Sequence, residues 1–270
     1  MKTILVTGAA GGIGTRLRKL MKGAYPNMRW SDHAVPKDLA PDETFVKADL
    51  ANMSEVEKMV DGVDGIVHMG GFSVEGPWDT ILSANIVGYY NLLEAARRAK
   101  VQRVVYASSN HAVGFFPRQR RIKIEDPVRP DTRYGVSKAF GEAISALYAF
   151  KHGLRITCLR IGHVTDTPID KRALSIWLAP QDLVQLIRIG LDHPDIRYEV
   201  FFGVSDCDRG FWDNTPAFRY GYKPQHRAED YAAQALEVTR KKPPVPVDAW
   251  YQGGPFAAEE FDGGIERWPT

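Results

Sequence analysis

Cysteine is scarce in this chain, with only Cys158 and Cys207 among 270 residues. Two cysteines cannot build a disulfide framework or a cysteine-rich metal site, and no metal is expected. Cys158 stands in an apolar run and is expected to be a buried thiol. A surplus of one charge is also missing. The 35 basic and 33 acidic residues give no reason to expect nucleic acid or a membrane surface as the partner.

Long apolar runs are missing too, since none reaches the ~20 residues that a membrane-spanning helix needs. The first residues enter a predicted strand directly, which leaves no room for a signal peptide, so a cytoplasmic protein is expected. The sequence is 44% hydrophobic and 25% charged, a composition typical of a globular protein with a large core.

Glycines gather directly after the first predicted strand, residues 2–7. They are Gly8, Gly11, Gly12 and Gly14, with Ile13 between the last two, and helical periodicity begins at 15. A glycine turn between a strand and a helix lets a backbone approach the pyrophosphate of a dinucleotide at the helix N-terminus. The Gly-x-x-Gly-x-x-Gly spacing differs by one residue from the commoner pattern. The alternative is an ordinary glycine turn.

Acidic residues end the next two predicted strands. Asp32 lies about 20 positions beyond the glycine turn, where a carboxylate accepts hydrogen bonds from the adenosine ribose and disfavours a 2′-phosphate. This predicts NAD rather than NADP, although Arg16 and Arg29 could accommodate that phosphate, and a solvated turn aspartate is the alternative. Asp49 and the backbone N–H of Leu50 are expected to hold the adenine edge.

A fourth predicted strand, residues 65–68, ends in a second glycine pair. The segment around this pair comprises His68, Met69, Gly70, Gly71 and Phe72. The cofactor is expected to pass over it, because side chains at the glycine positions would obstruct the cofactor. Ser73 is expected to point into the same crevice. For His68, a hydrogen-bonded structural histidine is the alternative. Asn85 interrupts the apolar face of the helix predicted over 78–100, so it is either structural or part of a proton relay.

The regular alternation of strands and helices predicts an α/β fold, a doubly wound parallel sheet of the Rossmann type with a small C-terminal substrate-binding region. Ligands of such sheets bind beyond the carboxyl ends of the strands, where all the segments named above converge. We expect a cofactor-binding core over 1–160, a substrate-binding region that completes the fold over 161–227, and a helix with a tail over 228–270. The tail is rich in proline, glycine and aromatic residues, and we expect it to dock on its own body or on a neighbouring subunit.

A tyrosine and a lysine open the helix predicted over 134–152. Tyr134 and Lys138 are four positions apart and share a helix face. An ammonium beside a phenol is expected to lower the phenol pKa, which would make Tyr134 a general base. Ser109, at the end of the fifth strand, could hold the substrate oxygen. Arg172 has the planar fork that suits a carboxylate, with a solvated surface arginine as the alternative.

These motifs resemble the extended, epimerase/dehydratase-like branch of the short-chain dehydrogenase/reductases over about residues 1–225. Within the branch, the chain is similar to the uronate dehydrogenases. The closer cues are the segments Gly71-Phe-Ser73-Val-Glu, Ser108-Ser-Asn-His111, Arg160-Ile-Gly162, Arg172-x-Leu-Ser-x-Trp177 and Gly210-Phe-Trp212-Asp-Asn214.

The resemblance implies NAD-dependent oxidation of a hexuronic acid, such as D-glucuronate or D-galacturonate, at C1 to the aldarolactone. It implies Tyr134 as the base and Lys138 on the nicotinamide ribose. It implies sugar contacts from Ser73, Ser109, Asn110 and His111, and a pairing of Arg172 with the carboxylate. His163 lies near the nicotinamide and departs from the small hydroxyl residue usual there. The tail after about 227 is expected to extend beyond the family.

Two rival functions stay open at this point. A nucleotide-sugar epimerase or dehydratase of the same branch is one, although the segment between 160 and 222 is short for cradling a UDP group. A non-catalytic NAD-binding sensor is the other, although it would have no chemical need for Ser109, Tyr134 and Lys138 together. The resemblance also implies a homo-oligomer built on the long helices predicted over 78–100 and 134–152.

Overall fold

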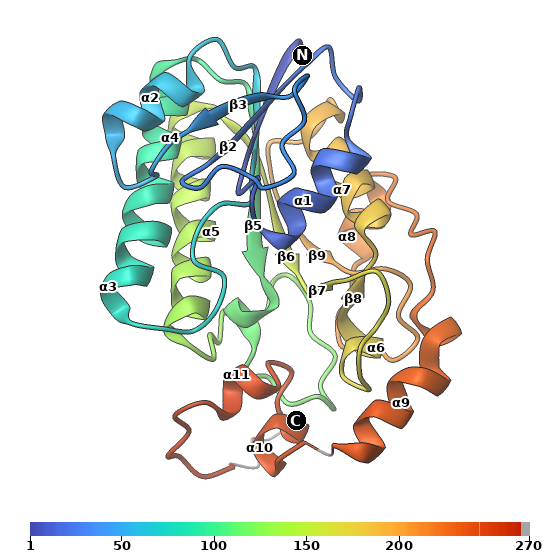
Figure 1. The fold of residues 1–270 in the computed structure, drawn as a ribbon. Helices are drawn as coiled ribbons and strands as arrows, with labels where there is room; N and C mark the ends of the chain where they lie inside the picture. Colours follow the sequence, from blue (N-terminus) through green and yellow to red (C-terminus); the bar gives the residue numbers. More distant parts are fainter. Residues whose placement is uncertain (243, 266–270) are drawn as a thin grey trace.

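A seven-stranded parallel sheet, in the order β3-β2-β1-β4-β5-β6-β9, forms the centre of the computed structural model, which describes residues 1–242 and 244–265. Figure 1 shows helices on both faces of this sheet, so the predicted doubly wound fold is confirmed. The strands are β1 (Thr3–Thr7), β2 (Asn27–Asp32), β3 (Thr44–Lys47), β4 (Gly65–His68), β5 (Arg103–Ser109), β6 (Arg155–Ile161) and β9 (Tyr198–Gly203).

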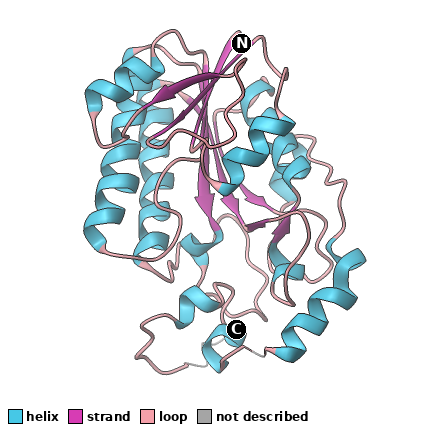
Figure 2. Ribbon diagram, in the orientation of Figure 1, coloured by secondary structure: helices cyan, strands magenta, loops and turns pink. Residues whose placement is uncertain are grey.

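The helices cover the two faces of the sheet in two groups, which Figure 2 shows in a single colour against the strands. One group packs α1 (Gly12–Leu20) against α7 (Pro180–Asp192), and the other packs α4 (Gly88–Arg98) between α2 (Met53–Val60) and α5 (Arg133–His152). Each group closes a separate apolar core over the sheet. Nothing in the described part of the chain is a helix with both the length and the apolarity needed to cross a membrane.

The helix predicted over 78–100 runs over residues 78–98, but it is not α-helical throughout. It consists of α3 (Trp78–Ile81), a π-helical turn η1 (Leu82–Val87) and α4, and Asn85 lies in the π-helical turn. Such turns insert an extra residue into a helix and are frequent at functional sites. The side chain of Asn85 is thereby directed at the loop that follows β4, as its hydrogen bonds below demonstrate.

Short elements surround the carboxyl edge of the sheet. Figure 1 shows α10 (Pro246–Trp250) and α11 (Pro255–Ala258) beyond the strand ends, at the bottom of the view. The remaining elements are the 3-10 helix η2 (Asn110–Val113), the two-stranded pair β7 (His163–Val164) and β8 (Trp177–Leu178), α6 (Ala173–Ile176), α8 (Thr215–Arg219), η3 (Ala228–Tyr231) and α9 (Ala232–Lys241).

The C-terminal tail docks on its own body, one of the two expected outcomes. Its Tyr251 forms an isolated β-bridge with Pro117, and the backbone N–H of Gly253 donates to the Gly114 carbonyl at 2.9 Å. Arg118 holds the tail through the carbonyls of Asp248 and Tyr251 at 2.6 and 3.0 Å. The tail therefore covers the edge of the sheet at which the predicted site residues converge.

Candidate active site

The glycine turn leaves the first turn of α1 open. No side chain caps this helix, whose N-cap is Gly11, so its first N–H groups are available to an anion. Gly14 must be glycine, because a Cβ there would lie 2.0 Å from the Gly8 carbonyl oxygen. At Gly12, by contrast, a Cβ would meet only the Arg16 guanidinium, at 3.9 Å. Close packing behind the turn and open space before it fit the pyrophosphate of a dinucleotide.

Asp32 lies directly against this turn. Its carboxylate accepts hydrogen bonds from the backbone N–H of Ala10 at 3.0 Å and of Ala34 at 3.2 Å. The two arginines that could have favoured NADP have protein partners. Arg16 pairs with Asp166 at 3.0 Å, and Arg29 donates to the main-chain carbonyls of Met59 and Asp61 at the C-terminal end of α2. A fixed carboxylate without a free arginine beside it suits the ribose hydroxyls of NAD.

Asp49 and Leu50 follow β3 at the same edge. Asp49 is exposed, and its carboxylate accepts only a local bond, from the N–H of Ala51 at 2.9 Å. Leu50 packs against the two glycine positions Gly70 and Gly88, where an added Cβ would meet its side chain at 3.1 and 2.8 Å. Leu50 therefore lies beside Gly70, and the adenine contacts of Asp49 and Leu50 stay a prediction.

His68 is a correction to the predicted cofactor contacts. Its ring is buried in the core, stacked on Tyr89 at 5.0 Å, and its Nδ1 shares a hydrogen bond with Thr7 Oγ1 at 2.8 Å. Burial lowers the pKa of this imidazole to about 3, so the ring is neutral. The side chain turns inward because β4 is buried along its whole length, and it cannot reach a cofactor at the surface.

For Asn85 the structural alternative applies, because its amide already has protein partners. Its Oδ1 accepts from the Phe72 N–H at 2.7 Å, while its Nδ2 donates to the Phe72 carbonyl and to Ser137 Oγ, both at 2.9 Å. Both amide hydrogens are thus used. Asn85 supports the loop over which the cofactor was predicted to pass, and joins that loop to α5.

Tyr134 and Lys138 lie side by side near the start of α5, both buried. The Lys138 ammonium is 5.4 Å from the centre of the Tyr134 ring and donates to the Ala107 carbonyl at 2.8 Å. The Ser109 side chain, at the end of β5, is close enough to the Tyr134 hydroxyl to act on its pKa. The structure therefore brings the three predicted catalytic residues together.

The expected direction of the Tyr134 pKa is wrong. Burial raises the pKa of Tyr134 to about 12, although the nearby Ser109 side chain opposes this effect. Burial also lowers the pKa of Lys138 to about 8. The reason is that both groups are withdrawn from water, which disfavours phenolate and ammonium alike, while the ammonium bonds to a carbonyl.

The side chains predicted to contact the sugar surround the Tyr134–Ser109 pair. With the Asn110 amide in the orientation that satisfies its neighbours, its oxygen accepts from Arg172 Nη2 at 3.1 Å and its nitrogen donates to the Ile161 carbonyl at 3.1 Å. The His111 ring meets the Tyr134 ring edge-on at a centroid distance of 5.9 Å. Ser73 is exposed, and among the described residues no hydrogen bond joins its side chain to this group.

Arg172 is not the solvated surface arginine of the alternative reading. Its Nε donates to the Gln252 carbonyl at 2.9 Å, and burial together with the nearby Arg118 lowers its pKa to about 10. His163 lies partly buried on β7, and burial and the charge of Arg172 lower its pKa. The Arg172 guanidinium is therefore fixed by a hydrogen bond, and its positive charge favours the uncharged form of the nearby His163 imidazole.

Four residues of the site were missed by sequence reasoning. Phe256 of α11 stacks on His111 at 4.1 Å, and Asp131 accepts from the His111 ring at 2.7 Å. Glu75 accepts from the Tyr134 backbone N–H at 2.9 Å. Gln252 is buried beneath Arg172. All four stand in segments without strand or helix periodicity. The one available signal was that Asp131 lies three residues before Tyr134 in the sequence.

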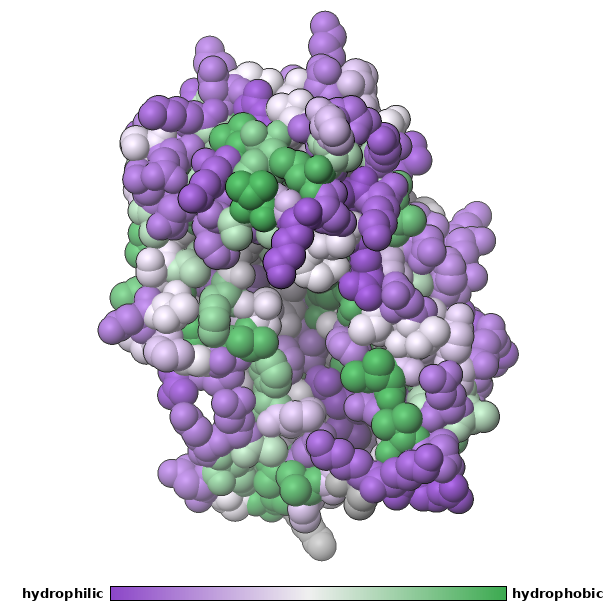
Figure 3. All heavy atoms as spheres, viewed as in Figure 1, coloured by the Kyte–Doolittle hydropathy of each residue, from purple (hydrophilic) through white to green (hydrophobic). Residues whose placement is uncertain are grey.

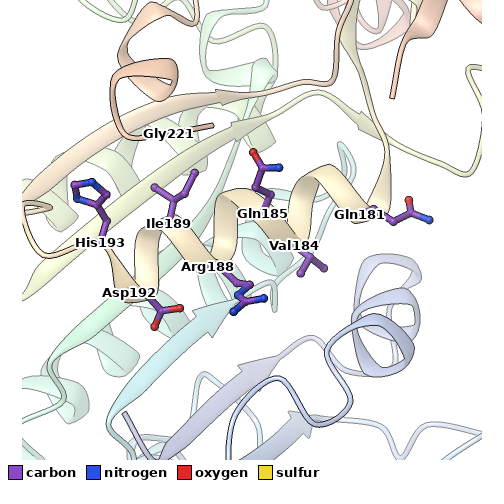
Figure 4. A pocket seen from close by; sticks show the side chains of 8 residues that line it. All are labelled: Gln181, Val184, Gln185, Arg188, Ile189, Asp192, His193 and Gly221. Atoms are coloured by element: carbon purple, nitrogen blue, oxygen red, sulfur yellow. The ribbon is translucent and has the colours of Figure 1, made fainter. Parts of the chain in front are cut away.

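Two hollows lie on the surface. One, of about 340 Å³, is lined by Glu75, Asp131, Thr132 and the residues that follow α11, beside the site just described. Figure 3 shows that this face of the molecule is hollowed near its centre, above the C-terminal segment. The other, of about 600 Å³, runs along α7 (Figure 4) and is lined by none of the predicted site residues.

Comparisons with known proteins show the family of this chain. Residues 4–166 match the model of the NAD dependent epimerase/dehydratase family. A uronate dehydrogenase of Agrobacterium fabrum is 42% identical over 95% of this chain and 97% of its own length. A uronate dehydrogenase structure from Agrobacterium tumefaciens, a mutant complexed with NAD, has a TM-score of 0.90 at 40% identity, covering 96% of this chain and 97% of that one.

A third relative is the glucuronic acid dehydrogenase of Chromohalobacter salexigens, whose structure has a TM-score of 0.90 at 38% identity and covers 95% of this chain and 97% of that one. These coverages include most of residues 228–270, so the expectation that the tail extends beyond the family is wrong. The chain belongs to the NAD-dependent epimerase/dehydratase family of extended short-chain dehydrogenase/reductases, and within it is similar to the uronate dehydrogenases over nearly its whole length.

Proposed function

We propose that this protein is an NAD-dependent uronate dehydrogenase that oxidises a hexuronic acid, D-glucuronate or D-galacturonate, at C1 to the aldarolactone. One observation carries the proposal. The Tyr134 hydroxyl and Ser109 lie at the same sheet edge as the guanidinium of Arg172, which donates to Asn110, the residue after Ser109. A proton acceptor and a carboxylate partner thus flank one crevice beside the open glycine turn.

Each predicted cofactor contact has a place in this proposal. The N-terminus of α1, with Gly11, Gly12 and Ile13, would bind the pyrophosphate, and Asp32 would accept from the adenosine ribose. Asp49 and Leu50 would border the adenine. Bound NAD would supply the hydride acceptor for C1.

At the reacting end, the chain's own residues orient the sugar and move a proton. Ser109 would hold the C1 oxygen, and the Tyr134 phenolate would take its proton. Lys138 would bind the nicotinamide ribose and His163 would border the nicotinamide. Ser73, Asn110 and His111 would contact the sugar hydroxyls, and Arg172 its carboxylate.

The proposed site favours a small sugar acid over a nucleotide sugar. Phe256 covers one face of His111, and Gln252 lies against Arg172, so the C-terminal segment closes the side on which a UDP group would need room. An NADH absorbance assay against hexuronates, neutral hexoses and UDP-sugars tests this choice. Absence of turnover with every hexuronate would exclude the proposed function, and NAD binding without turnover on the whole panel would favour a sensor.

Arg172→Ala is expected to lower kcat/KM for a hexuronate by about 10- to 100-fold, the worth of a charge-assisted hydrogen bond. The loss should fall on KM, because the carboxylate is bound equally before and during the reaction. Arg172→Lys should recover only part, since the ammonium lacks the planar fork. Any slow turnover of a neutral hexose should be unchanged. An equal loss with hexuronate and neutral hexose would remove the carboxylate role.

The pH profile is expected to show one rising limb. The active form needs the Tyr134 phenolate and the Lys138 ammonium, whose pKa values are about 12 and about 8. Below pH ~8 the phenolate fraction rises tenfold per pH unit, while above it the loss of ammonium cancels this gain. Measured as kcat/KM for NAD, which reports the free enzyme, activity should therefore rise to about pH 8 and then level off. A flat profile between pH 6 and 8 would contradict this assignment.

We further propose a cytoplasmic homo-oligomer that associates through α4 and α5. Their outer faces expose Tyr90, Leu147 and Phe150, the last at 79%. Light scattering coupled to size-exclusion chromatography tests this, and a monomer at micromolar concentration would contradict it.

We also propose three functional regions along the chain. Residues 1–160 would bind the cofactor, residues 161–227 would bind the substrate, and residues 228–270 would cover the site. Strand β9 joins the first two regions in one sheet.

A further inference from the structure

The His111 ring is held on every side but one. Its Nδ1 lies 2.7 Å from Asp131 Oδ2, Phe256 stacks on its face at 4.1 Å, and Tyr134 meets it edge-on at 5.9 Å. The Asp131 side chain is 0% exposed. An ionised carboxylate can only accept, so Nδ1 carries the proton when Asp131 is ionised. The other ring nitrogen, Nε2, is thereby left with a lone pair for a ligand.

Asp131 is itself fixed by its surroundings. Its second oxygen, Oδ1, accepts from Thr132 Oγ1 at 3.1 Å, and its backbone N–H donates to the His111 carbonyl at 3.2 Å. Glycines on two segments make room for the carboxylate, since a Cβ at Gly114 or Gly253 would lie 1.9 or 1.8 Å from Oδ2. The loop after η2 and the C-terminal segment therefore close around this one side chain.

The same contacts tie His111 to the helix that carries Tyr134. Thr132 is the N-cap of α5 and accepts from the Gly135 N–H at 2.9 Å. Gly135 packs so closely on the His111 carbonyl that an added Cβ would lie 2.3 Å from it. Asp131 thus lies between His111 and the first turn of α5, and sets the position of the ring relative to the phenol.

We propose that Asp131 is a positioning residue that holds His111 in the Nδ1–H tautomer, so that Nε2 accepts a hydrogen bond from a hydroxyl group of the sugar acid. The inference rests on the proposed function, and adds to it the residue that makes His111 an acceptor. Without the carboxylate, either ring nitrogen could carry the proton, and in the tautomer with Nε2–H the ring would donate to the hydroxyl oxygen instead of accepting from the hydroxyl.

The activity test is a double-mutant cycle with a hexuronate as substrate. Asp131→Ala is expected to lower kcat/KM by about tenfold or more, a loss of the order of one buried hydrogen bond. Asp131→Asn should recover part of it, because an amide oxygen can still accept from Nδ1. In the His111→Ala background, Asp131→Ala should add less than about twofold, because Asp131 acts through the ring. KM for NAD should not change.

The matched control is Asp126→Asn in the same loop, where the carboxylate pairs with Arg120 at 2.5 Å. It should leave kcat/KM unchanged. A merely structural Asp131 would cost the same factor with and without the His111 ring, and that result would overturn the proposal. So would an unchanged kcat/KM in Asp131→Ala.

A second readout does not need turnover. In ¹⁵N NMR spectra of the imidazoles, the signal assigned by its loss in His111→Ala should show Nδ1 protonated and Nε2 bare, and Asp131→Ala should shift it toward a tautomer mixture. A protonated Nε2 in the unmodified protein would overturn the proposal. If no hexuronate is turned over, the proposed function fails, while the tautomer is still decided by this spectrum.

Discussion

Tyr134→Phe is expected to lower kcat with a hexuronate by about 10²- to 10⁴-fold, the contribution of a positioned general base. The substitution keeps the ring that packs against His111 and removes only the hydroxyl beside Ser109. KM for NAD should stay within about twofold, because the phenol is not among the groups that bind the adenosine half. Initial-rate measurements of NADH absorbance give both kcat and the KM for NAD.

A control on the same helix separates this effect from a disturbed α5. Tyr148 is also buried, and its hydroxyl donates to Glu94 Oε2 at 3.0 Å, far along the helix from Ser109. Tyr148→Phe loses this hydroxyl and its hydrogen bond, and should lower the melting temperature while leaving kcat unchanged. A Tyr134→Phe protein with kcat within about threefold of the unmodified protein would show that another group takes the proton.

The cofactor side of the site could be predicted because it depends on local sequence and on sheet topology. The glycine turn and Asp32 sit at the ends of β1 and β2, and the parallel sheet brings strand ends to one edge. The same logic placed Ser109 beside Tyr134. Periodicity also located the long helices, but it did not show the π-helical turn η1 in the first of them.

The predictions for His68 and for the Tyr134 pKa were wrong because they depend on the direction of a side chain and on its burial, which the sequence pattern does not show. His68 ends a strand at the cofactor edge, yet its ring turns into the core because Tyr89 and Thr7 offer it partners there. Lys138 has the helical spacing that brings it to Tyr134, yet spacing says nothing of how strongly burial opposes the phenolate. Neither environment is encoded within a few residues of the position.

The substrate side was missed for a different reason. Phe256, Gln252 and Asp131 reach the site from loops and short helices, and their partners lie far away in sequence. No periodicity marks such contacts. The composition of the tail did indicate docking, because its aromatic residues would be costly to expose, but not the surface on which it docks.

A chain that ends at Lys241 is expected to lose measurable hexuronate turnover and to keep NAD binding. The removed segment provides Phe256, which packs on His111, and the Gln252 carbonyl, which accepts from Arg172 Nε at 2.9 Å. Among the described residues, no hydrogen bond or ion pair joins the glycine turn or Asp32 to this segment. NAD titration by calorimetry and an NADH assay therefore report on the two halves of the site separately.

Gln252→Ala tests the same point with less disruption. The Gln252 side chain is 1% exposed and accepts from Trp212 Nε1 at 2.8 Å, while it donates to the Pro117 and Arg120 carbonyls at 3.1 and 2.8 Å. Its loss leaves a buried indole N–H without its partner, at about 1–3 kcal/mol, so the melting temperature should fall. KM for the hexuronate should rise as the backbone under Arg172 loosens.

Gln185→Ala is the matched control, because this glutamine exchanges two hydrogen bonds with the Lys223 backbone on the outer side of α7. It should change neither kinetic parameter. If Gln252→Ala lowers the melting temperature but leaves KM for the hexuronate unchanged, the tail stabilises the fold without forming the substrate site. A raised KM that is confined to carboxylate-bearing sugars would instead place its effect on Arg172, since only that guanidinium needs the Gln252 carbonyl to stay in position.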